Sequence, residues 1–246
     1  MRWRLLAAGF GVYVIVLIVM VPATLVDAIL SGTGDGRLRL AEAQGTLWSG
    51  SGQLELRDPG GRSGVAKSIA WRALPASLLR GRLECEVELD RAKRRFPVTI
   101  SLSGAEIADG DINLPAVALG YAVPKLAPLE LSGDLLIHLS NFSVGRTRMQ
   151  GNATLQWRAA GSALTPVAPL GDYELRIEGT ESVIRASLRT LKGPLQLDGQ
   201  GTWTPGDKPA VLATARIPSQ LQSQLTPLLR LIAIERGDGS FELQLK

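Results

Sequence analysis

The sequence predicts a mainly β protein, in which a single N-terminal transmembrane helix precedes a curled, largely antiparallel β-sheet domain with one or two short helices. Three observations lead to this fold class. The chain begins with a long uncharged apolar run, most of the remainder alternates apolar and polar residues, and helical periodicity is confined to two short places. Alternation with a period of two is typical of strands that bury one face.

The N-terminal run extends from Leu5 to Val26 without a charged residue. About 20 residues of helix cross a hydrocarbon core of ~30 Å, so this run is long enough to act as an anchor. Arg2 and Arg4 precede it, and positive charge favours the cytoplasmic side. We therefore expect residues 1–4 in the cytoplasm, 5–26 in the membrane and 27–246 on the far side.

Two features qualify this anchor. Pro22 should kink the helix or end it early, because proline removes a helical hydrogen bond. The alternative to an anchor is a secretory signal cleaved after Ala28, although the apolar run exceeds the 7–15-residue core of such signals.

Strands are expected wherever apolar residues recur at every second position. The clearest runs are 83–89, 98–102, 135–139, 153–157, 173–177, 184–188, 195–197, 211–217 and 241–245. A glycine followed by two alternating apolar residues recurs six times between Gly52 and Gly239, at gaps of 22 to 52 residues, and such uneven gaps argue against a strict solenoid and favour one long meandering sheet.

A bulged hairpin is expected between two further alternating runs, at 38–40 and 54–56. Glycines at 45, 50 and 52 punctuate the connection, which suits a turn with a bulge. Trp48 should then pack against the sheet at its membrane-proximal end. The alternative is an exposed Trp48 that docks a partner subunit.

Helical signals are few. The segment 75–80 is expected to form a short turn or helix, and 218–234 a longer one whose leucines share a face. Pro227 would bend the longer helix or divide it in two.

The composition excludes most histidine and cysteine chemistry. The chain has one histidine, His138, and one cysteine, Cys85, so it has neither a multi-histidine zinc site nor an intramolecular disulfide. In the alternating pattern of its strand, His138 occupies a polar position, and Cys85 occupies an apolar position. The glutamates at 84, 86 and 88 share one face, which we interpret as solvated. We expect no catalytic, metal-binding or cofactor-binding residues, and no enzymatic activity.

The charge pattern does not favour nucleic acid. All 23 acidic residues and 25 of the 27 basic residues lie in 27–246, which leaves a formal charge of +2 there. The basic cluster at 91 and 93–95 is interpreted as a solvated hairpin tip.

Four tryptophans lie in or beside the predicted strands and are interpreted as wedges in the core. If the sheet curls, its concave apolar face is an alternative groove for an acyl chain or an extended peptide.

Several stretches, taken in order and spacing, resemble the N subunit of the bacterial type II secretion system, also called general secretion pathway protein N. They are Gly45-Thr-Leu-Trp-Ser-Gly-Ser-Gly52, then 71–83, 151–157, 171–173 and 193–203. They contain the residues that we single out as structural or interaction residues: Gly45, Leu47, Trp48, Gly50, Trp71, Pro75, Trp157 and Trp203.

This resemblance implies a single-pass bacterial inner-membrane protein with a periplasmic β-rich domain. It implies an accessory role in moving folded proteins from the periplasm across the outer membrane, with other subunits of the secretion system as partners. It supplies no catalytic residues. A looser likeness to anchored periplasmic proteins of the AsmA type implies the alternative, a module that handles lipid or another hydrophobic ligand.

Overall fold

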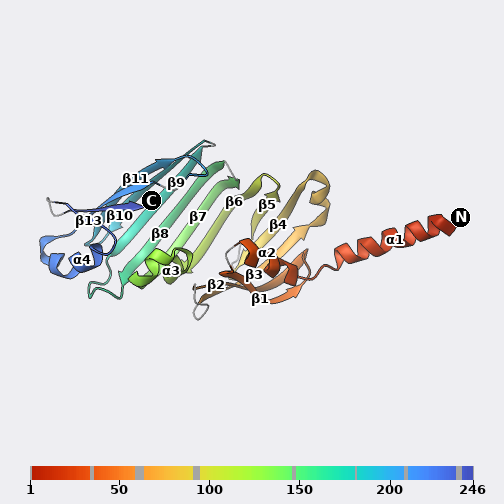
Figure 1. The fold of residues 1–246 in the computed structure, drawn as a ribbon, viewed down its shortest axis with the longest axis horizontal. Helices are drawn as coiled ribbons and strands as arrows, with labels where there is room; N and C mark the ends of the chain where they lie inside the picture. Colours follow the sequence, from red (N-terminus) through yellow and green to blue (C-terminus); the bar gives the residue numbers. More distant parts are fainter. Residues whose placement is uncertain are drawn as a thin grey trace. The chain divides into compact units, whose positions relative to one another are not determined.

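A computed structural model of the chain describes residues 2–33, 36–58, 64–90, 95–145, 148–180, 182–207, 210–236 and 240–245. The chain forms two compact units, residues 1–96 and residues 97–246 (Figure 1). The sequence shows no boundary at this point, since strand-like alternation runs on both sides of it.

The first unit opens with two helices, α1 (Arg2–Val19) and α2 (Thr24–Thr33). The uncharged run is therefore divided between them. The first helix ends three residues before Pro22, in agreement with the expected effect of that proline. In the part of the chain that the structure describes, no helix combines the length and apolarity needed to span a membrane.

Four antiparallel strands follow in sequence order: β1 (Leu38–Gly45), β2 (Ser49–Arg57), β3 (Gly64–Leu74) and β4 (Arg82–Leu89). A short 3₁₀ helix, η1 (Pro75–Arg80), joins the last two and confirms the expected turn or helix there. The pairing of β1 with β2 shifts register between Ala41 and Gln44, so the predicted bulged hairpin is confirmed. Helix α2 packs against β1.

The second unit is an antiparallel meander in which neighbours in sequence are neighbours in the sheet. Its strands are β5 (Phe96–Ser101, which begins at the boundary), β6 (Gly104–Pro115), β7 (Leu131–Gly145), β8 (Met149–Ser162), β9 (Gly171–Thr180), β10 (Val183–Lys192), β11 (Gln196–Trp203), β12 (Val211–Arg216), β14 (Phe241–Leu245) and β13 (Ile234–Glu235). The final pair alone departs from sequence order. The predicted mainly β, largely antiparallel class is confirmed.

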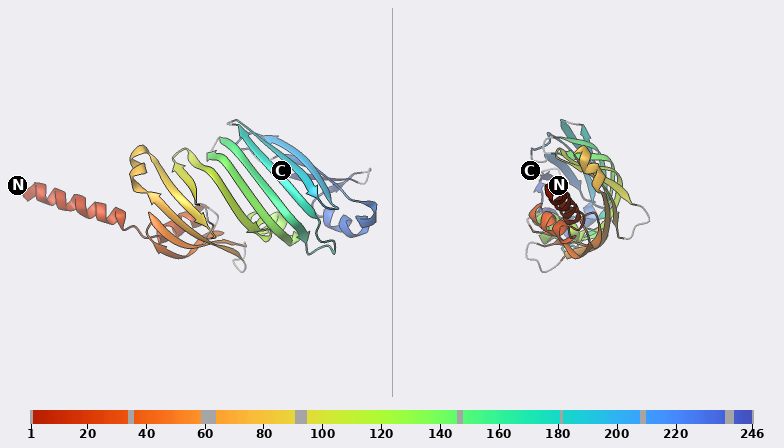
Figure 2. Two further views of the ribbon diagram at one scale, coloured as in Figure 1. Left: turned by 180° about the vertical axis from the view of Figure 1, so that it is seen from behind. Right: turned by 90° about the vertical axis from the view of Figure 1, so that its right-hand side faces the viewer.

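The main core of the second unit lies where its last helix meets the sheet. Helix α4 (Gln222–Leu229) buries Leu225, Leu228 and Leu229 against Leu195 of the β10–β11 turn and Phe241 of β14. Two further helices, α3 (Val117–Ala122) and η2 (Pro124–Leu129), connect β6 to β7. The strands curve around the side on which α3 and α4 lie (Figure 2).

The expected helix over 218–234 is shorter than predicted. A 3₁₀ turn, η3 (Ser219–Leu221), leads into α4, which ends two residues after Pro227, and Ile234 belongs to strand β13. Pro227 lies inside α4 and has no amide hydrogen to donate, so the helix has one backbone hydrogen bond fewer near its end.

Candidate functional site

The β1–β2 turn, Thr46–Trp48, carries the most distinctive stretch of the sequence. Its ends are joined by hydrogen bonds between Thr46 and Ser49: the Thr46 amide donates to the Ser49 carbonyl (2.9 Å) and the Ser49 amide to Thr46 Oγ1 (3.2 Å). Gly45 enters the turn with φ of 89°, and a Cβ there would lie 2.5 Å from the Ser49 carbonyl oxygen. Glycine is required at this position for both reasons.

This turn holds the junction between α1 and α2. The Leu47 amide donates to the carbonyl of Val21 (2.8 Å), and the indole Nε1 of Trp48 donates to the carbonyl of Ile18 (2.8 Å). Ile18 lies in the last turn of α1, where helix carbonyls have no partner within the helix. Trp48 therefore caps the C-terminal end of α1, and it is half-buried rather than fully exposed.

Trp71 supports the turn from the neighbouring strand. Its indole Nε1 donates to the Leu47 carbonyl (3.0 Å), and the Ala73 amide donates to the Trp48 carbonyl (2.6 Å). The Trp71 ring lies over Gly50, where a Cβ would be 2.5 Å from Cζ2 of the indole. Five of the residues singled out in the sequence thus meet in one place: Gly45, Leu47, Trp48, Gly50 and Trp71.

Pro75 lies two residues beyond Ala73 and opens η1, where its missing amide hydrogen has no consequence. Ser77 fixes the helix to the next strand, because its hydroxyl donates to the Leu74 carbonyl (2.6 Å) and accepts from the Glu84 amide (2.9 Å). Pro75 therefore begins the loop that follows the Trp48–Trp71 contacts, and its role as a structural or an interaction residue stays a prediction.

The other two tryptophans belong to the second unit. Trp157 donates from Nε1 to the Ser132 carbonyl (2.9 Å), and its ring meets that of Tyr173 at a centroid distance of 5.9 Å. Burial raises the pKa of the Tyr173 hydroxyl, which donates to the Leu195 carbonyl. Trp203 lies opposite Ile184 in the β10–β11 ladder. The contacts of Trp157 agree with its interpretation as a packing residue, and for Trp203 that interpretation stays a prediction.

On the polar face of the same sheet, Glu174 is almost fully buried beneath longer side chains. Its carboxylate accepts from Arg189 Nη2 (2.7 Å), Arg176 Nη2 (3.2 Å) and Gln156 Nε2 (3.1 Å). Burial is the largest influence on the pKa of Glu174 and raises it, but the hydrogen bonds from Gln156 and Arg189 and the charges of both arginines outweigh it. The pKa is therefore lowered overall, and the ion is held as a charge.

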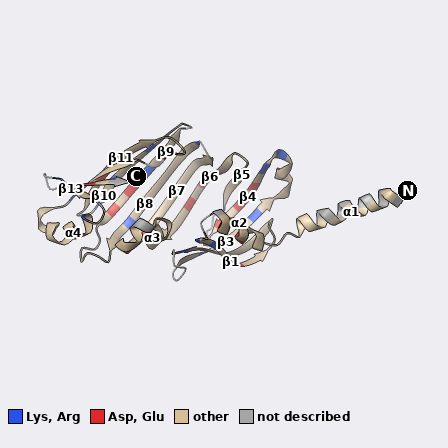
Figure 3. Cartoon of the chain, viewed as in Figure 1, with Lys and Arg blue, Asp and Glu red and all other residues tan. Residues whose placement is uncertain are grey.

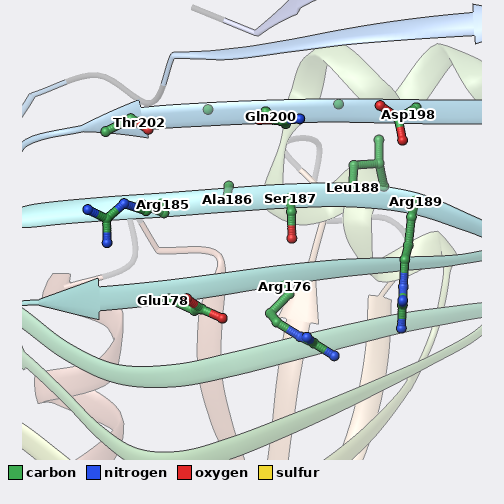
Figure 4. Close-up of a pocket in the computed structure, with 12 residues that line it drawn as sticks. Arg176, Glu178, Arg185, Ala186, Ser187, Leu188, Arg189, Asp198, Gln200 and Thr202 are labelled. Atoms are coloured by element: carbon green, nitrogen blue, oxygen red, sulfur yellow. The ribbon is translucent and has the colours of Figure 1, made fainter.

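A shallow polar furrow lies beside this cluster, over β9, β10 and β11 (Figure 4). It has a volume of about 380 Å³, and side chains of both signs line it, among them Arg185, Arg189, Glu178 and Asp198. Charged residues of both signs also mark the strands of the sheet in Figure 3. Such a surface suits polar contacts with another protein chain better than binding of a ligand with one sign of charge.

The remaining chemistry-bearing residues occupy the places that the alternation predicts. His138 is exposed on the polar face, with Nδ1 2.6 Å from Asp111 Oδ1. Burial raises the pKa of the Cys85 thiol, as expected for a small apolar residue. The glutamates at 84, 86 and 88 pair with nearby arginines. Among the residues whose placement is described, no three potential ligands gather as a metal site would require.

Comparison with known proteins decides the family. The family model of type II secretion system protein N matches residues 36–244. The chain belongs to the type II secretion system protein N family. No curated protein and no solved structure matches it.

The matched region of this protein N family member starts just after α2 and includes the β1–β2 turn, η1 and the strands of both units. The suspected resemblance is therefore confirmed over the β-rich part of the chain. Helix α1, whose end Trp48 caps, lies outside the match.

Sequence reasoning missed two acidic residues, Glu174 and Asp27, whose carboxylates join neighbouring elements through hydrogen bonds and ion pairs. Glu174 looks like any outward residue of an alternating strand, and only the fold brings Gln156 and Arg189 from neighbouring strands to it. Asp27 was expected only as the first residue beyond the anchor. Its carboxylate accepts the Leu40 amide (2.8 Å) and pairs with Arg39.

Proposed function

We propose that this chain is an accessory, non-enzymatic component of the type II secretion system. It is held in the bacterial inner membrane by its N-terminal segment, and its β-rich part acts in the periplasm by protein–protein contacts. The match to the protein N family over residues 36–244 carries this proposal. The role is support for the export of folded periplasmic proteins across the outer membrane.

Two features of the first helix support the anchor. The side chains described along α1 are uncharged (Figure 3), and many are largely exposed, Leu6, Phe10, Tyr13 and Val19 among them. Exposed apolar side chains all along a helix are costly in water and favourable in lipid. The 18 residues of α1 extend ~27 Å at about 1.5 Å per residue, close to the thickness of a hydrocarbon core.

The contacts with other subunits are best tested by photo-crosslinking in the native envelope, with the neighbouring secretion genes present. Probes are placed at Gln200 and Thr202, which line the polar furrow of β9–β11, and at Glu106 on the exposed polar face of β6 as a comparison. Crosslinks to other secretion subunits support the proposal. Crosslinks solely to unrelated envelope proteins contradict it.

A lipid-handling role of the AsmA-like type remains the alternative, and one observation favours it. Apolar residues on the inner face of the second unit, including Ile137, Leu155 and Leu175, are half-buried rather than buried. Native mass spectrometry of the purified full-length protein distinguishes the roles, because a stoichiometric bound lipid is expected only for the alternative.

A further inference from the structure

The loop between β3 and β4 ends in an exposed apolar tip. Within Leu74–Arg80, the side chains of Leu74 and Leu78 are about half exposed and that of Leu79 is 92% exposed. Pro75, Ser77 and Gly81 fix the shape of this loop, so the leucines are held outward by a defined 3₁₀ turn. An ordered loop that presents leucines to the surroundings is typical of a contact surface.

Two hydrogen bonds through Trp48 link the base of this loop to the end of α1. The Ala73 amide, one residue before Leu74, donates to the carbonyl of Trp48, whose indole donates to the carbonyl of Ile18. In Figures 1 and 2, η1 and the C-terminal end of α1 lie at the same end of residues 1–96. The base of the loop is thus tied, through Trp48, to the C-terminal end of the proposed anchor.

The charge beside the tip is positive. Arg80 closes η1 in the sequence Leu78-Leu79-Arg80, and among the described residues no carboxylate lies within ion-pair distance of its guanidinium. The loop itself contains no acidic residue. Apolar side chains next to an arginine match the membrane interface, where acyl chains lie just below anionic headgroups.

We propose that the η1 loop, Leu74–Arg80, inserts its leucines into the periplasmic leaflet of the inner membrane beside α1. Arg80 then lies among the anionic lipid headgroups of that leaflet. This inference rests on the proposed anchor. It gives the first unit a second attachment to the bilayer surface, in addition to the end of α1. Two attachments restrict the orientation of that unit far more than a single helix end does.

Depth-dependent quenching in bilayers tests the contact on the full-length protein. In a Cys85→Ala background, a fluorescent label is attached to Leu79→Cys, and the protein is reconstituted into phosphatidylethanolamine–phosphatidylglycerol vesicles that contain doxyl-labelled lipid. We expect strong quenching at Leu79→Cys. A label on Leu102→Cys, a fully exposed leucine in the β5–β6 turn, is the matched control and should remain unquenched.

Arg80→Gln tests the electrostatic part of the inference. One basic residue near an anionic surface favours binding by about 1 kcal/mol, or about fivefold in the ratio of inserted to free loop. In vesicles that contain phosphatidylglycerol, the Leu79→Cys label should be quenched less in this variant, by about fivefold in the ratio of inserted to free loop, and quenching should change little in pure phosphatidylcholine.

A third label, on Phe10→Cys in α1, separates failure of this inference from failure of the anchor. A quenched Phe10 label with an unquenched Leu79 label overturns the loop contact and leaves the anchor standing. If the labels at Phe10 and Leu79 both remain in water, the anchor and the loop contact are both wrong. Quenching at Leu79 that also occurs at Leu102 overturns the specific contact in favour of general adsorption.

Discussion

At the scale of single residues, the β1–β2 turn depends on close contacts that leave no space for a larger side chain. Gly50→Ala places a Cβ 2.5 Å from Cζ2 of Trp71, so the indole has to move. We expect a loss of about 1–3 kcal/mol in the free energy of unfolding, as for other overpacked sites. Gly32→Ala in α2 is the control, since a Cβ there meets nothing within 4 Å. Equal melting temperatures for the two variants would contradict the close contact between Gly50 and the Trp71 indole.

Trp48→Phe tests the cap on α1, because it removes the indole donor to the Ile18 carbonyl and retains an aromatic ring. The expected loss is about 0.5–1.5 kcal/mol, and Trp48→Ala should lose more because it also removes packing. Thermal unfolding and secretion are measured on the same variants. Normal melting with lost secretion would show that Trp48 serves as a partner contact instead of a structural residue.

The carboxylate of Glu174 should make stability depend on acid pH. Its pKa is lower in the folded protein than the ordinary value of 4.5, so its contribution is present above that pH and is lost as the pH falls below it. We therefore expect Glu174→Gln to lower the melting temperature near pH 7, by an amount that diminishes toward pH 3. Glu178→Gln, on the same strand and exposed, is the control. If Glu174→Gln lowers the melting temperature by the same amount at every pH, the stabilisation does not come from an ionised Glu174 carboxylate.

At the scale of elements, Asp27 joins α2 to the outermost strand of the first unit. Its carboxylate accepts the Leu40 amide and pairs with Arg39, and this backbone hydrogen bond is the largest cause of its lowered pKa. An unpaired strand edge invites association with other chains, so the carboxylate also protects β1.

Asp27→Ala should accelerate hydrogen exchange at the Leu40 amide, whereas Asp27→Asn should retain most of the protection because the amide oxygen still accepts. Both variants lose the ion pair with Arg39, so the comparison isolates the backbone contact. Equal exchange in the two variants would show that the side-chain acceptor does not protect this edge.

The elements that the sequence predicts well are those with uninterrupted alternation. Strands β4, β8, β9 and β10 appear where apolar residues recur at every second position, because one face of each is buried. Helix α3 was missed since its six residues, Val117–Ala122, are too few to display a helical period. The helix at the C-terminal end was predicted to be too long because apolar periodicity continues past Leu229, whereas only a few turn hydrogen bonds, such as that from the Ala233 amide to the Leu229 carbonyl, follow there.

At the scale of the whole molecule, the sequence predicts the class and the family but not the division after residue 96. Both units are antiparallel meanders with similar alternation, so composition does not mark where one ends. The candidate site was predicted in part. Gly45, Trp48 and Trp71 were singled out from the sequence, but the hydrogen bond from Trp48 to Ile18 depends on tertiary structure that spans 30 residues of chain.

We propose that this protein N family member supports type II secretion. The most direct measurement is the secreted fraction of every substrate of the pathway in a strain that lacks the chain, with the full-length protein restored as the comparison. We predict that substrates accumulate in the periplasm without the chain and that the restored protein returns them to the medium. Unchanged secretion of all substrates in the deletion strain would contradict the account.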